Sequence, residues 1–134
     1  MAELLQTFFH DRHLAHKATM VDFGGWDMPV QYAPGVLQEH LITRKHAGLF
    51  DVSHMGRFII RGADALKFLQ LVLTNNAAAL ERWQSQYTII ADEHGYAIDD
   101  AYLYRFYDDE YLLVVNASNR DKDWRHFQEQ SRGF

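Results

Sequence analysis

Cysteine is absent from this sequence of 134 residues. Disulfide bonds, thiolate catalysis and zinc sites built on thiolates are therefore excluded within this chain. An excess of basic residues is also missing, because 13 Lys and Arg residues stand against 18 Asp and Glu residues, for a formal net charge of −5. This balance argues against a nucleic-acid surface, which needs a basic stripe.

The chain also lacks a cationic and apolar start of the signal-peptide kind, and it has no apolar run of membrane-spanning length. We therefore expect no membrane or nucleic-acid partner, and a cytoplasmic location. What is present is a 48% share of hydrophobic residues and a 14% share of aromatic residues. The length suits one domain with a real core, so we expect a single domain over residues 1–134.

The clearest structural signal lies in residues 84–116, where three runs rich in β-branched and aromatic residues are separated by two turn sequences. Tight turns are expected at residues 92–95 and 108–110, and the runs between them predict three β-strands. The middle strand holds the acid pair Asp99 and Asp100, although aspartate is depleted in strands. An acid pair placed against local preference indicates a functional position.

Side chains alternate across a strand, so the two acids of this pair face opposite ways. Asp100 shares its face with Tyr102 and Tyr104, whereas Asp99 shares its face with Arg105. The pattern predicts that Asp100 is desolvated among aromatic rings and suited to proton transfer or cation stabilisation, and that Asp99 is solvated or paired. A bulge within the pair would exchange these roles. The structural alternative is a strand-end acid bonded to backbone.

Apolar spacing predicts three helices and one further strand outside this stretch. The helices are expected over residues 36–47, over residues 63–74 and around Trp124 and Phe127, and the strand over residues 57–61. Ser118 or Asn119 can cap the last helix. With an extended segment near residues 20–32, the order is β, α, β, α, β, β, β, α. This order predicts an α+β fold, with a mainly antiparallel sheet and flanking helices.

His10, His13 and His16 are spaced by three residues near the start of the chain. At that spacing the imidazoles drift around a helix and do not converge, so we expect a solvated polar face and no metal site. Two glycines, Gly24 and Gly25, break the extended segment that follows.

Residues 51–54 read Asp-Val-Ser-His, the residue types of a hydrolytic triad. Adjacent Ser53 and His54 would point apart, so the pattern favours a turn held by the side chains of Asp51 and Ser53. Asn116 ends an apolar run, where its amide could meet both donors and acceptors of a heterocycle. It could equally begin the cap of the following helix.

Four sequence blocks carry a resemblance to a known family. They are Met-Val-Asp-Phe-Gly-Gly-Trp at residues 20–26, Gly-Leu-Phe-Asp-Val-Ser-His-Met-Gly at 48–56, Gly-Tyr-Ala-Ile-Asp-Asp at 95–100, and Leu-Val-Val-Asn-Ala at 113–117. In this order they resemble the aminomethyltransferase (T protein) family of the glycine cleavage system. The likeness covers the N-terminal portion of that family's folate-binding region.

The resemblance implies a transferase of one-carbon metabolism that acts in glycine catabolism with tetrahydrofolate as co-substrate. A lipoyl-bound aminomethyl group would pass its methylene to tetrahydrofolate, giving methylene-tetrahydrofolate and ammonia. The family's key acid corresponds to Asp100, which would orient the folate and assist at the reacting nitrogen. Family folate contacts also correspond to Met55, Tyr87, Tyr104 and Asn116. The first three would stack on the pterin, and Asn116 would hydrogen-bond its edge.

The family is roughly three times as long as this chain, and it commonly has glycine where Tyr96 stands. The fold is therefore expected to resemble half of the family's folate-binding region. A lone half would leave strand edges uncovered, which favours a homodimer. Three functions stay open: aminomethyl transfer with an H-protein-like lipoyl carrier as partner, a non-catalytic folate-binding or regulatory module, and a fragment of a folate-dependent demethylase or sarcosine-type oxidase. Activity of the chain alone is also open.

Overall fold

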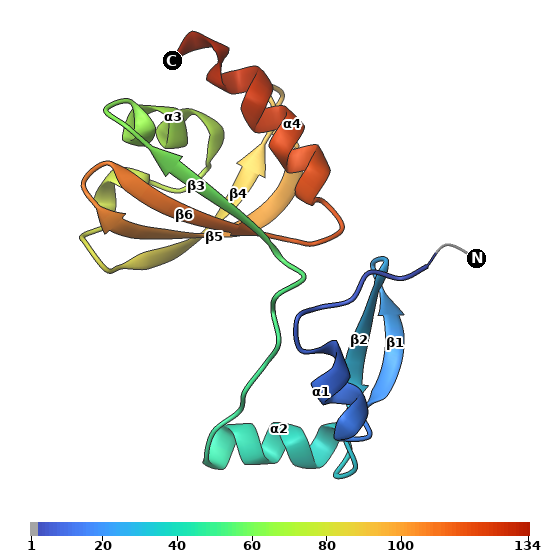
Figure 1. The fold of residues 1–134 in the computed structure, drawn as a ribbon. Coiled ribbons are helices and arrows are strands. Elements are labelled where there is room, and N and C mark those ends of the chain that lie inside the picture. The colour runs from blue at the N-terminus through green and yellow to red at the C-terminus, as the bar shows by residue number, and fades with distance from the viewer. Residues whose placement is uncertain (1–2) are drawn as a thin grey trace. The chain divides into compact units, whose positions relative to one another are not determined.

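A computed structural model describes residues 3–134, and the chain divides into two compact units, Met1–His54 and Met55–Phe134. In unit 1, helix α1 (His10–Ala15) precedes the strands β1 (Thr19–Phe23) and β2 (Trp26–Gln31), and helix α2 (Val36–Lys45) follows them (Figure 1). The predicted order lacked α1 and treated β1 and β2 as one segment. The helix predicted over residues 36–47 is confirmed.

The strands β1 and β2 form an antiparallel hairpin in which Phe23 pairs with Trp26. The two residues between them, Gly24 and Gly25, have φ angles of 60° and 89°. A two-residue hairpin loop with two positive φ angles is a type I′ turn, which favours glycine because it carries no Cβ. The Gly25 amide also donates to Asp22 Oδ1 at 2.9 Å. The predicted chain break is therefore the tip of a hairpin.

Unit 2 combines four strands with two α-helices and two short 3₁₀ turns. In chain order they are β3 (Gly56–Arg61), α3 (Ala65–Val72), η1 (Ala77–Ala79), β4 (Ser85–Ala91), β5 (Ala97–Tyr107), β6 (Glu110–Val115), α4 (Arg120–Gln130) and η2 (Ser131–Gly133). The sheet order is β3-β6-β5-β4, with every neighbouring pair antiparallel. The three strands predicted in residues 84–116 and the helices on either side of them are confirmed.

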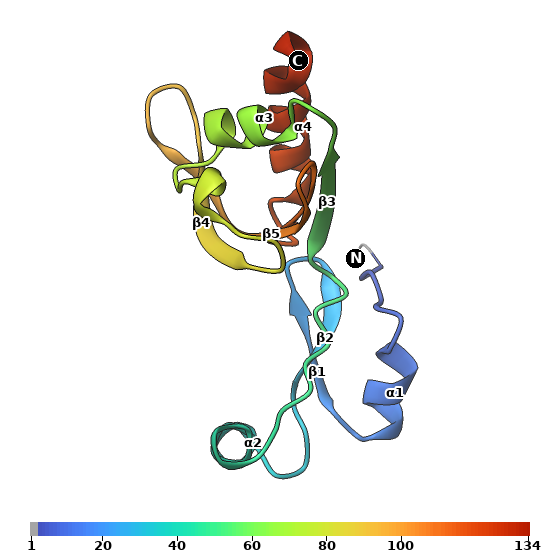
Figure 2. The ribbon, with the colours of Figure 1, turned by 90° about the vertical axis from the view of Figure 1, so that its left-hand side faces the viewer.

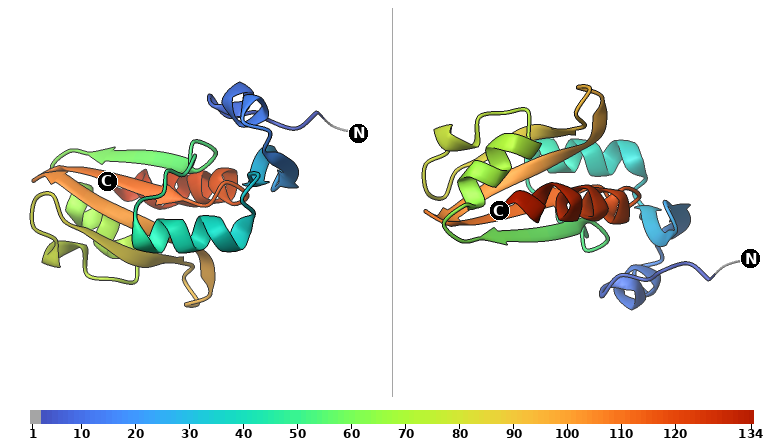
Figure 3. Two further views of the ribbon diagram at one scale, coloured as in Figure 1. Left: turned by 90° about the horizontal axis from the view of Figure 1, so that it is seen from below. Right: turned by 90° about the horizontal axis from the view of Figure 1, so that it is seen from above.

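Both helices of unit 2, α3 and α4, pack on the same face of the sheet (Figures 1 and 2). The view from above in Figure 3 shows them in front of the strands. The core between helices and sheet consists of Phe58, Ala65, Phe68, Leu69, Val72, Leu73, Ala77, Leu80, Ile90, Ala101, Leu103, Tyr111, Leu113, Val115 and Phe127. Burial along β6 alternates residue by residue, as expected for a sheet with one covered face.

Gly56 begins β3 where this strand, β6 and α4 approach one another closely. A Cβ at this position would lie 2.6 Å from Cγ2 of Val115 and 2.8 Å from Cγ of Arg120. Contacts this short are repulsive, so only glycine allows the strand to begin here without a shift of its neighbours.

The architecture of unit 2, an antiparallel sheet with flanking helices, confirms the predicted α+β class. Over residues 3–134, the structure contains no helix with the length and apolar character needed to cross a membrane.

Candidate functional site

The two acids of β5 lie on opposite faces of the sheet, but their burial is the reverse of the prediction. Asp99 is 7% exposed, whereas Asp100 is an exposed residue. The strand irregularity lies between Ala97 and Asp99, so it does not separate the two acids. The prediction that aromatic rings desolvate Asp100 is therefore wrong. The reason is that α3 and α4 pack on the face of Asp99, where Ala101 and Leu103 belong to the core.

Neutral amide groups hold the buried Asp99 carboxylate. The Asn116 backbone N–H donates to Oδ2 at 3.2 Å, and the side-chain amides of Asn116 and Asn119 donate to Oδ1 at 3.0 and 2.7 Å. Burial by itself would raise the pKa of Asp99, but these hydrogen bonds outweigh burial and lower that pKa. Arg105 shares the face of Asp99 yet binds elsewhere, so the expected charged partner is replaced by asparagines.

Asn116 joins the buried acid to the exposed one. Its Nδ2 donates to Asp99 Oδ1 at 3.0 Å and to Asp100 Oδ1 at 2.8 Å. A primary amide carries two hydrogens, so these two contacts use both. The Asn119 side chain bonds to Asp99 instead of capping α4, although Asn119 occupies the N-cap position. Helix α4 thus begins where predicted, and its cap residue belongs to the acid cluster (Asp99, Asp100, Asn116, Asn119 and Asp123).

The exposed face of the sheet carries tyrosines beside Asp100. Tyr87 on β4 lies opposite Tyr102, and Ile89 lies opposite Asp100. Residues directly opposite in an antiparallel pair share a face, and Tyr87 is 54% and Tyr102 42% exposed. The rings of Tyr102 and Tyr104 are 5.3 Å apart. Partial desolvation and the charge of the nearby Asp100 raise the pKa of Tyr87.

The remaining predicted residue, Met55, immediately precedes β3 and is half-buried. Gly56 pairs with Val115, so the direction of the two chains brings Met55 beside Asn116. The five predicted site residues therefore lie on, or at the end of, the sheet face that α3 and α4 leave open. Their roles as catalytic or folate-binding residues stay predictions.

Two of the three histidines predicted to lie on a solvated face are buried, and only His16 among them is exposed. His10 and His13 are each 7% exposed. His10 Nε2 lies 2.7 Å from Asp27 Oδ2, and the ring nitrogens of His13 lie 2.7 Å from the Tyr32 hydroxyl and 2.9 Å from Asp51 Oδ2. Among residues 3–134, no group of three or more His, Asp or Glu side chains is arranged to hold a metal ion.

The Asp51 segment is the predicted turn. The Ser53 N–H donates to Asp51 Oδ1 at 2.9 Å. Burial would raise the pKa of Asp51, but hydrogen bonds from Ser53 and His13 outweigh burial and hold that pKa far below its ordinary value. Asp51, His13 and Tyr32 also line a cavity of about 810 Å³ in unit 1. Their polar groups bond to one another, so these contacts tie together the three segments of unit 1 from which the residues come.

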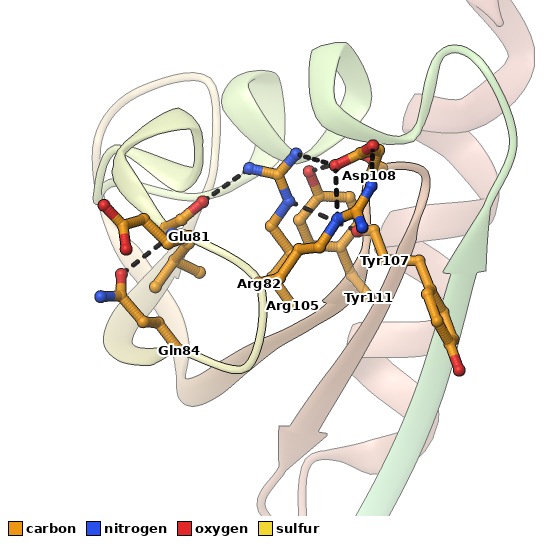
Figure 4. Close-up of polar contacts among 8 residues, drawn as sticks. Glu81, Arg82, Gln84, Arg105, Tyr107, Asp108 and Tyr111 are labelled. Carbon is orange, nitrogen blue, oxygen red and sulfur yellow. Dashed lines mark hydrogen bonds and ion pairs between the residues drawn. The ribbon is translucent and has the colours of Figure 1, made fainter.

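A second polar cluster in unit 2 lies at the other end of β5 (Figure 4). The guanidinium of Arg82 pairs with Asp108 through two contacts, while Arg105 donates to Asp108 Oδ1 at 3.3 Å and to the Leu80 carbonyl at 2.6 Å. The hydrogen bond and charge of Arg82 lower the pKa of Asp108. The charged groups of this arginine cluster (Arg82, Arg105 and Asp108) are already paired, so it fastens the β5–β6 turn.

Sequence reasoning missed one residue of the acid cluster, Asp123. It is 0% exposed and lies on α4, four residues before the core residue Phe127. Residues four apart share a helix face. The spacing was therefore a usable signal that an acid points toward the core.

The chain matches the family model described as the GCVT N-terminal domain over residues 9–133. An aminomethyltransferase of Desulfitobacterium hafniense (strain DSM 10664 / DCB-2) is 48% identical over 134 residues, which is 100% of this chain and 36% of the relative. An aminomethyltransferase of Deinococcus deserti is 50% identical over 131 residues, which is 98% of this chain and 36% of the relative. The chain thus spans about a third of the length of these relatives.

Among solved structures, the glycine cleavage system aminomethyltransferase T from Bartonella henselae matches with a TM-score of 0.92 and 38% sequence identity. The match covers 98% of this chain and 36% of that chain. It agrees with the mixed helix and antiparallel-sheet fold expected from the sequence. The family model, the curated relatives and the solved structure agree with the resemblance first seen in the four sequence blocks, and the chain belongs to the GCVT N-terminal domain family.

Proposed function

We propose that this chain supplies the folate-binding surface of an aminomethyltransferase of the glycine cleavage system. In the proposed reaction, a methylene group leaves the sulfur of an aminomethyl-lipoyl carrier and joins two nitrogens of tetrahydrofolate. Ammonia is released and the lipoyl thiol is regenerated. The relatives named as aminomethyltransferases, at 48% and 50% identity over nearly the whole chain, support this proposal.

The observation that carries the proposal is the grouping of Tyr87, Asp100, Tyr104 and Asn116 on the open sheet face. A reduced pterin is flat and partly polar, and exposed tyrosine rings offer stacking area with hydroxyl groups at the edge. The Asp100 carboxylate beside them provides a negative charge. The residues present therefore fit a pterin.

Asp100 would act at the reacting carbon and nitrogen. As methylene transfer passes through an iminium-like cation, a fixed carboxylate stabilises the positive charge and can accept a proton from the attacking nitrogen. The hydrogen bond from Asn116 Nδ2, at 2.8 Å, fixes one oxygen of Asp100, so the carboxylate need not reorganise during the step. Tyr87 and Tyr104 would position the ring.

The direct test is a titration with tetrahydrofolate followed by an ammonia-release assay with an aminomethyl-lipoyl carrier. Both are run on the 134-residue chain and on the reading frame that contains it. Binding with ammonia release supports the transferase. Binding without transfer in either form points to a folate-binding or regulatory module, and formaldehyde release from a methylated amine points to a demethylase or oxidase fragment. No binding in either form would refute the folate proposal.

The proposed partners are tetrahydrofolate, an H-protein-like lipoyl carrier and a second copy of the chain. We also propose that units 1 and 2 belong to one folate-binding-type domain and that the protein is cytoplasmic. Sedimentation is the test of self-association. A monodisperse monomer at micromolar concentration would remove the homodimer.

A further inference from the structure

Asp123 is an acid buried next to another acid. Its side chain is fully buried on α4, and neither carboxyl oxygen receives a hydrogen bond from an N–H donor among the described residues. Asp123 lies one helical turn after Asn119, to whose carbonyl its backbone N–H donates at 2.9 Å, and the Asn119 side chain donates to Asp99 Oδ1 at 2.7 Å, so the two acids are neighbours in the core. Two ionised carboxylates share such a site only at a large electrostatic cost, so one of them keeps a proton below neutral pH.

The surrounding donors decide which acid keeps the proton. Asp99 accepts three N–H hydrogen bonds from Asn116 and Asn119, which favour its ionised form. The Asp123 carboxyl oxygens accept none of these N–H hydrogen bonds, so no comparable donor among residues 3–134 favours the ionised form of Asp123. A nearby cation, Lys122 on the same helix, donates from its Nζ to the Ile98 carbonyl at 2.6 Å.

Burial and the charge of Asp99 raise the pKa of Asp123 to about 7, and Lys122 opposes this only in part. Below neutral pH the proton therefore lies on Asp123, the acid without N–H donors, and Asp99 is its acceptor.

We propose that Asp123 is a positioning residue for the folate surface: its carboxylic acid O–H donates to Asp99 and so holds the Asn116 amide in a single orientation. This inference rests on the proposed function. The order of contacts is Asp123 to Asp99 to Asn116 to Asp100. Asp123, which does not touch the ligand, would thus set the geometry of Asn116 and Asp100, which do.

The orientation of Asn116 has a consequence for the ligand. Its nitrogen faces two carboxylates, which accept but do not donate, so the amide cannot be turned around. Both hydrogens are used, and only Oδ1 remains for a ligand. Asn116 would therefore recognise a ring N–H or an amino group, both of which a pterin offers. Ionisation of Asp123 would remove its O–H donor to Asp99, so the Asn116 amide would no longer be held in one orientation.

Two substitutions separate positioning from packing. Asp123→Asn keeps a donor toward Asp99 and cannot ionise, whereas Asp123→Leu keeps the volume and removes the donor. The dissociation constant for tetrahydrofolate is measured between pH 6 and 8.5. We expect the unsubstituted chain to lose about tenfold in affinity across this range, the effect of about one hydrogen bond to a charged group.

Asp123→Asn should keep the pH 6 affinity throughout, and Asp123→Leu should bind about tenfold more weakly at every pH. Asp121→Asn, at an 81%-exposed acid on the same helix, is the matched control and should follow the unsubstituted chain. The same pH profile in Asp123→Asn and in the unsubstituted chain would overturn the inference.

A second measurement does not depend on folate binding. In the ligand-free protein, carbon NMR of the Asp123 carboxyl group should show a midpoint near neutral pH, and the side-chain amide signal of Asn116 should shift with the same midpoint. A carboxyl that titrates in the ordinary aspartate range would refute the inference. If the carboxyl and amide titrate as expected but tetrahydrofolate does not bind, the positioning contact stands and the proposed function fails.

Discussion

The two ends of strand β5 hold acids in opposite ways. At the start of the strand, Asp99 is buried and receives its hydrogen bonds from Asn116 and Asn119, without a cation. At the end of the strand, Asp108 is solvent-exposed and pairs with Arg82 and Arg105. The Asp108 carboxylate is neutralised by its two arginine partners, so the arginine cluster fastens a turn and presents no negative charge to a ligand.

Neutral donors leave the negative charge in place. Amide donors stabilise a carboxylate geometrically without cancelling its charge. The acid cluster therefore holds one net charge in the core at Asp99 and presents another at Asp100, on the face with the tyrosines. The difference indicates that the first end of β5 is suited to stabilising a cationic reaction centre and that the second end is structural.

The largest expected effect comes from removing the exposed charge of the acid cluster. Asp100→Asn should lower the rate of ammonia release by about 10²- to 10⁴-fold, because it removes the group that meets the developing cation. The free energy of unfolding should change by no more than about 1 kcal/mol, since Asp100 is exposed. Asp109→Asn, at an exposed acid in the β5–β6 turn, is the control. Equal rates in Asp100→Asn and the parent would refute the assignment.

The buried acid should matter most for stability. Asp99→Asn replaces an acceptor of three hydrogen bonds with an amide whose N–H₂ faces other donors. We expect the free energy of unfolding to fall by about 2–4 kcal/mol, measured by urea denaturation. The loss of transfer activity should be smaller than in Asp100→Asn. A variant as stable as the parent would show that the Asn116 and Asn119 contacts are not important to the fold.

The pH dependence of stability is the next effect in size. The pKa of Asp123 rises from 3.8 in the unfolded chain to about 7 in the folded protein. Its contribution to stability is therefore complete below about pH 4 and declines as the pH rises to about 7. Asp123→Asn should remove this decline and stabilise the protein at pH 8 by on the order of 2 kcal/mol. Thermal unfolding of both proteins at pH 5 and pH 8 measures this change in stability. An Asp123→Asn variant less stable than the parent at pH 8 would contradict the prediction.

The smallest effect is expected at the other end of β5. Asp108→Asn breaks exposed ion pairs with Arg82 and Arg105, which are worth about 0–1 kcal/mol and weaken with salt. We expect a loss of at most about 1 kcal/mol in dilute buffer and less in 0.5 M NaCl (roughly a 4 Å screening length). If Asp108→Asn costs as much as Asp99→Asn, the two ends of β5 are alike and the comparison fails.

Local signals predicted much of the fold. The strand runs and turn residues in residues 84–116 correspond to β4, β5 and β6, and the apolar spacing predicted α2, α3 and α4. Helix α1 was missed because the first four of its six residues are all polar or charged and the helix has little apolar periodicity. The Ser53–Asp51 turn was predictable because it depends on neighbours in sequence.

The sequence by itself determined that Asp99 and Asp100 face opposite ways, because the strand period of two requires it. It also determined that Tyr102 and Tyr104 share the face of Asp100. Only the tertiary structure decided which acid is buried, because both faces of β5 carry apolar or aromatic side chains, and the packing of α3 and α4 selects one. Asn119, which donates to the buried acid, and Asp123, which is buried beside it, lie at the start of helix α4 and within it, some twenty residues away along the chain. Desolvation depends on such distant neighbours, and a local pattern does not contain them.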